Sequence, residues 1–121
     1  MSRKLIKSFK FAYEGVSTVF RTQRNFRIQI TIGIIAVGSA IFLGLSSVEW
    51  AILVLTIALV LSSEMINTAI ETAVDLSTTE LHPKAKLAKD LSAGVVLINA
   101  FIAVLVGIFI IGPHLLKLFK F

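Results

Sequence analysis

Three long apolar segments, separated by short polar ones, dominate the pattern of this chain. Residues 28–45 carry no charged side chain, residues 48–61 carry one, and residues 91–111 carry none. A helix of about 20 apolar residues is long enough to cross the hydrocarbon core of a bilayer. The pattern therefore predicts a membrane protein with three membrane-spanning helices.

The second apolar run is predicted to be the start of a longer helix, because residues 62–75 contain neither glycine nor proline and keep the helical period. The predicted spans are 28–45, 48–75 and 89–111. Gly112 and Pro113 are predicted to end the third helix and leave a short tail. The first and third spans contain small residues for close helix packing, among them Gly33, Gly38, Gly94 and Gly107.

The segment 2–24 alternates apolar and basic residues. Its apolar positions recur mostly every three or four residues, at Leu5, Ile6, Phe9, Tyr13, Val16 and Phe20. Basic residues fill much of its first half, at Arg3, Lys4, Lys7 and Lys10. This pattern predicts a basic amphipathic helix lying on the membrane surface.

The longest polar segment, residues 76–89, is predicted to be a loop with a break at Pro83. Seven lysines and arginines precede the first span, three lie in this loop, and two follow the third span. Because basic residues are retained on the cytoplasmic side of a membrane, this distribution predicts a cytoplasmic amino terminus and a cytoplasmic loop.

Composition supports one membrane domain over residues 1–121. The chain is 56% hydrophobic and 16% charged, and three spans with their connections use up its length. Its net charge is +5, but the basic residues flank the spans instead of forming a patch on a soluble fold, so no nucleic acid partner is predicted. The chain has no cysteine, which excludes disulfides and thiolate metal sites. The predicted fold class is an all-α membrane protein.

Four polar residues lie on one face of the predicted second helix: Glu64, Asn67, Glu71 and Asp75. Their spacings of 3, 4 and 4 residues place them within about 80° of arc around a helix. Ionisable groups at membrane depth are costly and usually mark a functional cavity. Because three of these residues are acidic, the stripe predicts a cation-binding site at the cytoplasmic boundary.

The stripe suggests a division of chemical roles. Glu64 and Glu71 are two helical turns apart, about 10 Å along the axis, so they cannot share one proton directly. The deeper carboxylate could accept a proton while the shallower ones hold a divalent cation through hard oxygen ligands. The alternative is that these residues only pair with cations on other helices or stay hydrated beyond the bilayer edge.

Opposite charge is predicted nearby, because Lys89 and Asp90 open the third span where Asp75 leaves the second. The lysine could reach a phosphate, although a solvated helix start is an equally reasonable interpretation of this dipeptide. The chain contains no glycine-rich phosphate loop, no HExxH and no nucleophile-elbow serine. Any phosphate chemistry must therefore depend on carboxylate-held metal and basic side chains.

The run at 64–71, with Val74-Asp75 after it and Lys89-Asp90 fourteen residues on, resembles the signature of the small prokaryotic diacylglycerol kinase family, which also contains undecaprenol kinases. The likeness covers nearly the whole chain, including residues 24–27, Glu49-Trp50 and His82-Pro83. The sequence of the loop that contains His82-Pro83 is more similar to Gram-positive undecaprenol kinases than to Gram-negative diacylglycerol kinases.

The resemblance implies a homotrimer in the bacterial inner membrane that transfers the γ-phosphate of ATP, with Mg²⁺, to a lipid hydroxyl at the cytoplasmic interface. Undecaprenol is the expected acceptor and diacylglycerol the alternative. By position, Glu64 would be the general base and Glu71 a magnesium ligand. The nucleotide site would be shaped by Asn67, Asp75, Glu80, His82, Lys89 and Asp90.

The chain departs from the family at Gln23, where the family has a glutamate that binds a second magnesium ion. An amide oxygen can still coordinate a hard cation, but the site loses a full negative charge. We therefore expect weaker metal binding and lower activity.

Two other functions fit some of these features. The acidic stripe could line a small ion or proton pathway between subunits, but residues 51–61 are apolar apart from Thr56, so no polar relay continues across the bilayer. Alternatively, the chain could be a structural membrane subunit whose acids pair with a partner. ATP turnover that depends on added lipid alcohol would distinguish a kinase from both.

Overall fold

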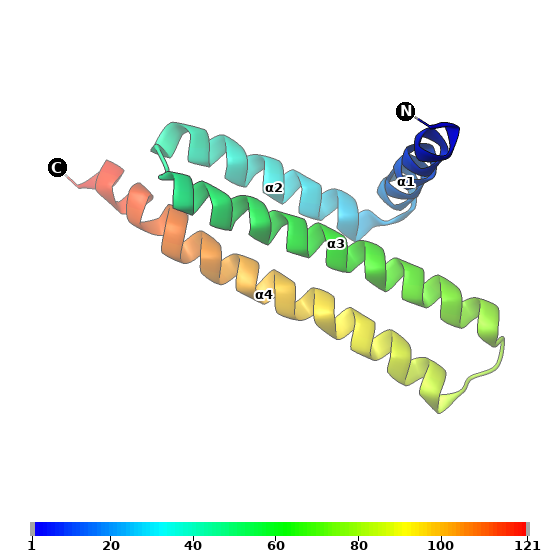
Figure 1. The fold of residues 1–121 in the computed structure, drawn as a ribbon. Helices are drawn as coiled ribbons and strands as arrows, with labels where there is room; N and C mark the ends of the chain where they lie inside the picture. Colours follow the sequence, from blue (N-terminus) through cyan, green and yellow to red (C-terminus); the bar gives the residue numbers. More distant parts are fainter. Residues whose placement is uncertain (1, 121) are drawn as a thin grey trace.

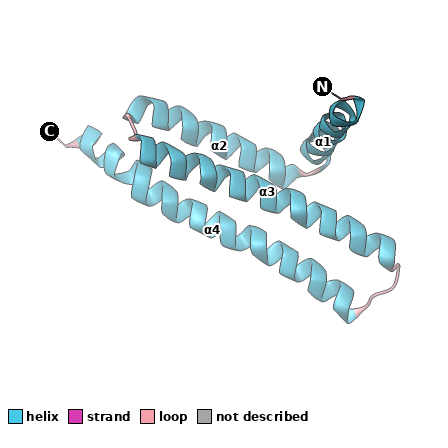
Figure 2. Ribbon diagram, in the orientation of Figure 1, coloured by secondary structure: helices cyan, strands magenta, loops and turns pink. Residues whose placement is uncertain are grey.

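The computed structural model describes residues 2–120, which form an all-helical structure (Figures 1 and 2). The helices are α1 (Arg3–Thr22), α2 (Arg24–Leu43), α3 (Ser47–Ser77) and α4 (Pro83–Phe119). Three of them, α2, α3 and α4, are long and apolar enough to cross a membrane. The predicted all-α fold with three candidate spans is therefore confirmed.

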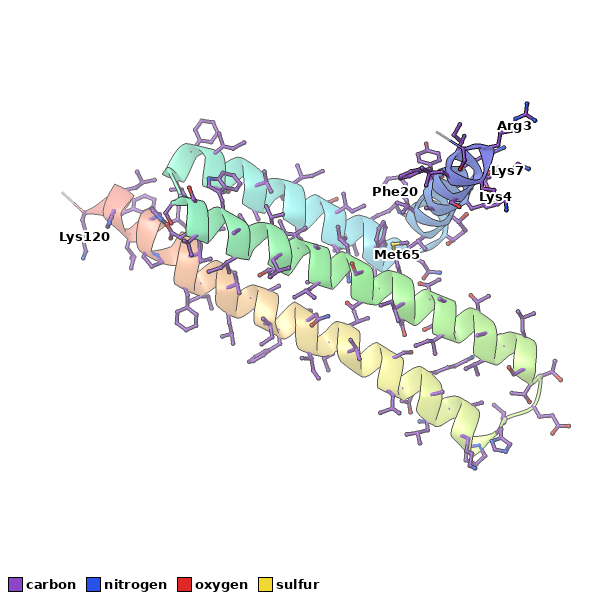
Figure 3. The ribbon with its side chains drawn as sticks, viewed as in Figure 1. Arg3, Lys4, Lys7, Phe20, Met65 and Lys120 are labelled. Atoms are coloured by element: carbon purple, nitrogen blue, oxygen red, sulfur yellow. The ribbon has the colours of Figure 1, made fainter. Side chains whose placement is uncertain are left out.

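The helix α1 runs at a steep angle to the other three (Figure 1). Its basic residues Arg3, Lys4 and Lys7 point away from the bundle, whereas Phe20 lies on the side nearer to it (Figure 3). The segregation of basic and apolar side chains predicted for residues 2–24 is thus present in a helix that is two residues shorter at its carboxyl end.

The junction between α1 and α2 is a sharp break at Gln23, whose backbone is extended (φ −108°, ψ 108°). The guanidinium of Arg27 donates hydrogen bonds through Nη1 to the carbonyl oxygens of Phe20 and Arg21, both at 2.9 Å. These carbonyls belong to the last turn of α1, where backbone acceptors lack helical partners. Arg27 therefore fixes the angle at which α1 leaves α2.

The turn between α2 and α3 is short because both helix ends are capped. Gly44 ends α2 in the left-handed conformation (φ 68°), which glycine adopts without steric cost. Ser46 Oγ then accepts a hydrogen bond from Glu49 N at 3.2 Å, and Glu49 Oε1 accepts one from Ser46 N at 3.0 Å. This reciprocal capping box fixes the start of α3.

The helices α3 and α4 form a long antiparallel pair that extends well beyond α2 (Figure 1). Their 31 and 37 residues correspond to about 46 and 56 Å, compared with a hydrocarbon core of about 30 Å. The part of the pair that projects past the start of α2 carries Glu71 and Asp75. The outer half of the acidic stripe therefore lies beyond the start of α2, whereas Glu64 lies beside Gln29 of that helix.

The buried apolar core is small and lies near the α2–α3 turn. It consists of Ala40, Leu45, Leu53 and Ile110. Most other apolar side chains are exposed, including Phe42 (91%) and Leu97 (72%). A single chain with so little core and so much outward apolar surface is suited to lipid or to further protein chains around it.

The predicted loop 76–89 is wrong in extent. The connection comprises only residues 78–82, and α4 already begins at Pro83. His82 caps this helix, because its Nδ1 accepts a hydrogen bond from Lys84 N at 3.1 Å. Proline is well suited to the first helical position, where its missing N–H would have no partner in any case.

The predicted end of the third helix at Gly112 and Pro113 is also wrong, since α4 continues to Phe119. Proline removes one backbone hydrogen bond and usually bends a helix. His114 nevertheless contacts Glu49 across the helix pair, with Nε2 at 3.2 and 3.1 Å from the two carboxylate oxygens. Helix continuation also keeps the remaining backbone groups paired where water is scarce.

The small residues pack less closely within this chain than predicted. A methyl group added at Gly33 would meet Ile57 Cγ2 of α3 at 3.4 Å. At Gly38, Gly94 and Gly107 it would meet no atom within 4 Å among residues 2–120. Of these four glycines, only Gly33 serves packing between helices of one chain.

Candidate active site

Glu64 is the most buried acidic residue of the described chain, with 3% of its surface exposed. It lies on α3 opposite Gln29 of α2, whose Nε2 donates a hydrogen bond to Glu64 Oε2 at 3.3 Å. Gln29 is five residues from the start of α2, which corresponds to about 8 Å of helix. Glu64 therefore lies at the level of the apolar span, deeper than the other acids of the stripe.

Asn67, one turn from Glu64, is a buried link between the stripe and α4. Its Nδ2 donates to Glu71 Oε1 at 3.2 Å, and its Oδ1 accepts from Ser92 Oγ at 2.7 Å. Ser92 Oγ also lies 3.0 Å from the carbonyl oxygen of Lys89. These contacts orient the Glu71 carboxylate and hold the start of α4 against α3.

Asp75 and Lys89 form an ion pair between α3 and α4, with Lys89 Nζ 2.5 Å from Asp75 Oδ1. The prediction that Lys89 lies where Asp75 leaves the second span is therefore confirmed. Asp90 points elsewhere and pairs with Lys86 on the same helix, also at 2.5 Å. Both pairs are largely open to solvent, which makes them accessible to a charged ligand.

A groove of about 610 Å³ lies between the ends of α3 and α4. It brings together five of the predicted nucleotide-site residues, namely Asp75, Glu80, His82, Lys89 and Asp90. The sixth, Asn67, lies deeper, beside Ser92. The groove is open to solvent and carries two lysines, Lys86 and Lys89, each paired with an aspartate, and Glu80 adds a third acid. A phosphate-bearing ligand would therefore bind by replacing an aspartate at one of these lysines.

These features agree with comparisons to known proteins. The family model for prokaryotic diacylglycerol kinase matches residues 10–111. The chain belongs to this family. Proteins of the family are lipid kinases, so the resemblance inferred from the residues is confirmed.

Named relatives include both expected acceptor specificities. The diacylglycerol kinase of Synechocystis sp. is 45% identical over 115 residues, which cover 94% of this chain and 66% of that protein. The undecaprenol kinase of Bacillus subtilis is 39% identical over 112 residues, which cover 93% of this chain and 91% of that protein. The diacylglycerol kinase of Escherichia coli K12 is 27% identical over 111 residues. The chain thus spans slightly less than two thirds of the Synechocystis relative but nearly all of the Bacillus relative.

Gln23, the position at which this chain differs from the expected family glutamate, lies at the break between α1 and α2. Its side chain is half-buried and makes no capping hydrogen bond to α2. Among residues 2–120, the structure shows no group of three or more histidine, cysteine or acidic side chains that could hold a metal ion. The pairing of Gln23 with Glu71 as metal ligands thus stays a prediction.

Sequence reasoning missed two residues of this candidate site, Gln29 and Ser92. Gln29 was detectable as the one amide within the uncharged first span, where a polar side chain is unusual. Ser92 gave no comparable signal, because serine is common in such helices and donates to its own backbone. Only the packing of α4 on α3 shows that Ser92 contacts Asn67.

Proposed function

We propose that this chain phosphorylates the hydroxyl group of a membrane lipid alcohol with ATP, and that undecaprenol is its main acceptor. The observation that supports this proposal is the arrangement along α3. The buried Glu64 lies at the level of the apolar span, and the same helix leads in three turns to the charged groove at Asp75 and Lys89. A lipid hydroxyl and a water-soluble nucleotide can therefore meet along one helix face.

The reaction requires a general base for the lipid hydroxyl, groups that position the γ-phosphate of ATP, and positive charge that neutralises the phosphate oxygens. Glu64 takes the proton of the lipid hydroxyl, whose oxygen forms a bond to the γ-phosphorus, while the bond to the bridging oxygen breaks and leaves ADP with the electron pair. Glu64 and Glu71 are about 10 Å apart along the helix, so Glu64 could act on the lipid hydroxyl while Glu71 would hold the magnesium ion that neutralises charge on the phosphates. The spacing of the stripe thus suits this division of roles.

The proposed donor set, one carboxylate and one amide oxygen, would suit Mg²⁺. In nucleotide sites this ion is usually held by one or two carboxylates together with phosphate oxygens. Glu71 offers a carboxylate oriented by Asn67, and Gln23 would offer an amide oxygen. When bound, the ion would neutralise developing charge on the phosphates. Lys89 would donate to phosphate oxygens, with Asp75, Glu80, His82 and Asp90 forming the wall of the groove.

We further propose that the chain works as a homotrimer in the bacterial inner membrane, with the amino terminus and the active site cytoplasmic. The open faces at Gly38, Gly94 and Gly107 would allow close approach of neighbouring helices. The basic residues at the start of α1 and in the α3–α4 connection support this orientation through the retention of positive charge inside.

Diacylglycerol is the second candidate acceptor, because the Synechocystis relative named as a diacylglycerol kinase is 45% identical. Undecaprenol is preferred because the Bacillus undecaprenol kinase is 39% identical over 91% of its own length, whereas the diacylglycerol kinases of Helicobacter pylori J99 and Escherichia coli K12, matched over 88% and 91% of theirs, are 32% and 27% identical. Both lipids present one hydroxyl at the interface, so an assay must compare them directly.

The test is phosphate transfer from radiolabelled ATP by the full chain in detergent, with undecaprenol and diacylglycerol offered side by side. We expect phosphorylated undecaprenol as the main product. Glu64→Gln should lower kcat by at least about 100-fold, the usual contribution of a general base. Glu49→Gln is the matched control, because it removes an acid at the opposite end of the same helix and should leave kcat within about twofold.

Two results would contradict the proposal. Wild-type protein that phosphorylates neither lipid would exclude the function. If Glu64→Gln were as active as Glu49→Gln, the kinase activity would stand, but Glu64 would not be its general base.

A further inference from the structure

Gln29 reaches Glu64 with only one end of its amide. Its Nε2 donates to Glu64 Oε2 at 3.3 Å, whereas its Oε1 is buried and accepts no hydrogen bond from any of residues 2–120. The opposite assignment of the amide would direct an acceptor at the carboxylate, which donates only when protonated. In the structure the amide N–H of Gln29, and not its carbonyl oxygen, faces the Glu64 carboxylate.

The unpaired oxygen calls for an explanation, since buried polar atoms in native proteins nearly always have a partner. Gln29 lies at a cavity of about 310 Å³ between α2, α3 and α4, whose other lining residues are apolar apart from Thr56. In such surroundings a free acceptor is unfavourable. A proton that arrives on Glu64 would supply the missing donor.

We propose that Gln29 is a positioning residue that holds Glu64 in both of its protonation states. While Glu64 is ionised, the amide N–H of Gln29 orients its carboxylate. Once Glu64 has taken the proton of the lipid hydroxyl, rotation of the amide by half a turn directs Oε1 at the new O–H group. The proton stays on Glu64 during this rotation, and only hydrogen bonds change.

This role depends on the proposed lipid kinase activity, in which Glu64 is the base. The role requires an amide, because a glutamine side chain carries both an N–H donor and a carbonyl acceptor. Rotation about its last bond lets it donate to a carboxylate or accept from a carboxylic acid. An apolar side chain of the same shape would serve neither. A base displaced by about 1 Å can lose much of its effect on the rate.

The first measurement compares Gln29→Met with wild type in the radiolabelled assay, with the lipid that wild type phosphorylates. Methionine preserves length and suits a membrane helix but removes both hydrogen-bonding atoms. We expect kcat to fall about 10- to 100-fold, while the KM for ATP stays within about twofold. The matched control is Asn99→Leu, which removes the amide that α4 directs at the Leu59 carbonyl of α3, and it should leave kcat unchanged.

The second measurement shows whether Gln29 acts through Glu64. Glu64→Asp retains a base but withdraws the carboxylate from Gln29 by one methylene. In that background Gln29→Met should cost less than about threefold in kcat, because the contact it removes is already lost. A residue that only stabilises the helix pair would cost the same factor in both backgrounds.

Binding of a fluorescent ATP analogue provides the test of folding and should be the same for Gln29→Met and wild type. The inference would be overturned by an unchanged kcat for Gln29→Met, by equal losses in the two backgrounds, or by loss of nucleotide binding together with kcat. If the wild-type chain had no lipid kinase activity, the proposed function itself would be wrong. Failure of the proposed function can therefore be told apart from failure of the inference about Gln29.

Discussion

The two ends of the α3–α4 pair both join the helices through a carboxylate and a basic side chain, yet they differ in what surrounds that pair. At the closed end, Glu49 contacts His114 and also caps α3, beside the buried cluster of Ala40, Leu53 and Ile110. At the open end, Asp75 contacts Lys89 at the mouth of a groove of about 610 Å³.

Buried residues follow the same division. The apolar core cluster lies towards the closed end. The section that leads to the open end buries Phe26 of α2 and also the polar side chains of Ser63, Glu64, Asn67 and Ser92. Polar groups are buried at a cost, and the hydrogen bonds between Asn67, Glu71 and Ser92 offset it only in part. The comparison indicates that the closed end is built for stability and the open end for binding and chemistry.

Lys89→Met should give the largest effect among tests of this difference. Loss of a charge-assisted contact to phosphate is expected to raise the KM for ATP about tenfold or more. The corresponding change at the closed end, Lys117→Met in the last turn of the same helix, should leave it unchanged. Initial rates over a range of ATP concentrations provide the measurement, and equal KM values for the two variants would remove Lys89 from the nucleotide site.

Gln23→Glu should have a smaller effect, seen only at low magnesium. A restored carboxylate at the α1–α2 break would strengthen cation binding, so the activity at limiting Mg²⁺ should rise several-fold and the two proteins should converge at saturation. Magnesium titrations of both proteins at fixed ATP would show this shift. Identical titration curves would exclude a ligand role for position 23.

Most of the fold could be predicted from the sequence because apolar runs of this length are satisfied in a membrane only as helices. The errors lie at helix ends, where local signals compete with tertiary contacts. Pro113 was expected to end α4, but the helix continues and His114 reaches Glu49. Pro83 was expected to break a longer loop, but it starts the helix that His82 caps.

The candidate site shows the same limit. Residues of the stripe could be predicted because one helix presents them at spacings that the sequence displays, and Asn67 indeed contacts Glu71. Gln29 and Ser92 come from other helices, so their partners depend on how α2 and α4 pack on α3. The charged pair of Lys89 with Asp75 was predictable only because both residues adjoin the same connection.

The smallest effect on activity is expected from His114→Phe at the closed end, and this variant tests whether that end serves stability alone. Phenylalanine keeps a ring of similar shape but removes the contact with both oxygens of Glu49, while the Glu49 cap on Ser46 remains. Thermal unfolding in detergent should begin a few degrees lower, and kcat and the KM for ATP at a lower temperature should match wild type. If His114→Phe instead lowered kcat with unfolding unchanged, the closed end would be coupled to Glu64, about 20 Å away along α3, and the division between a stabilising end and a chemical end would be wrong.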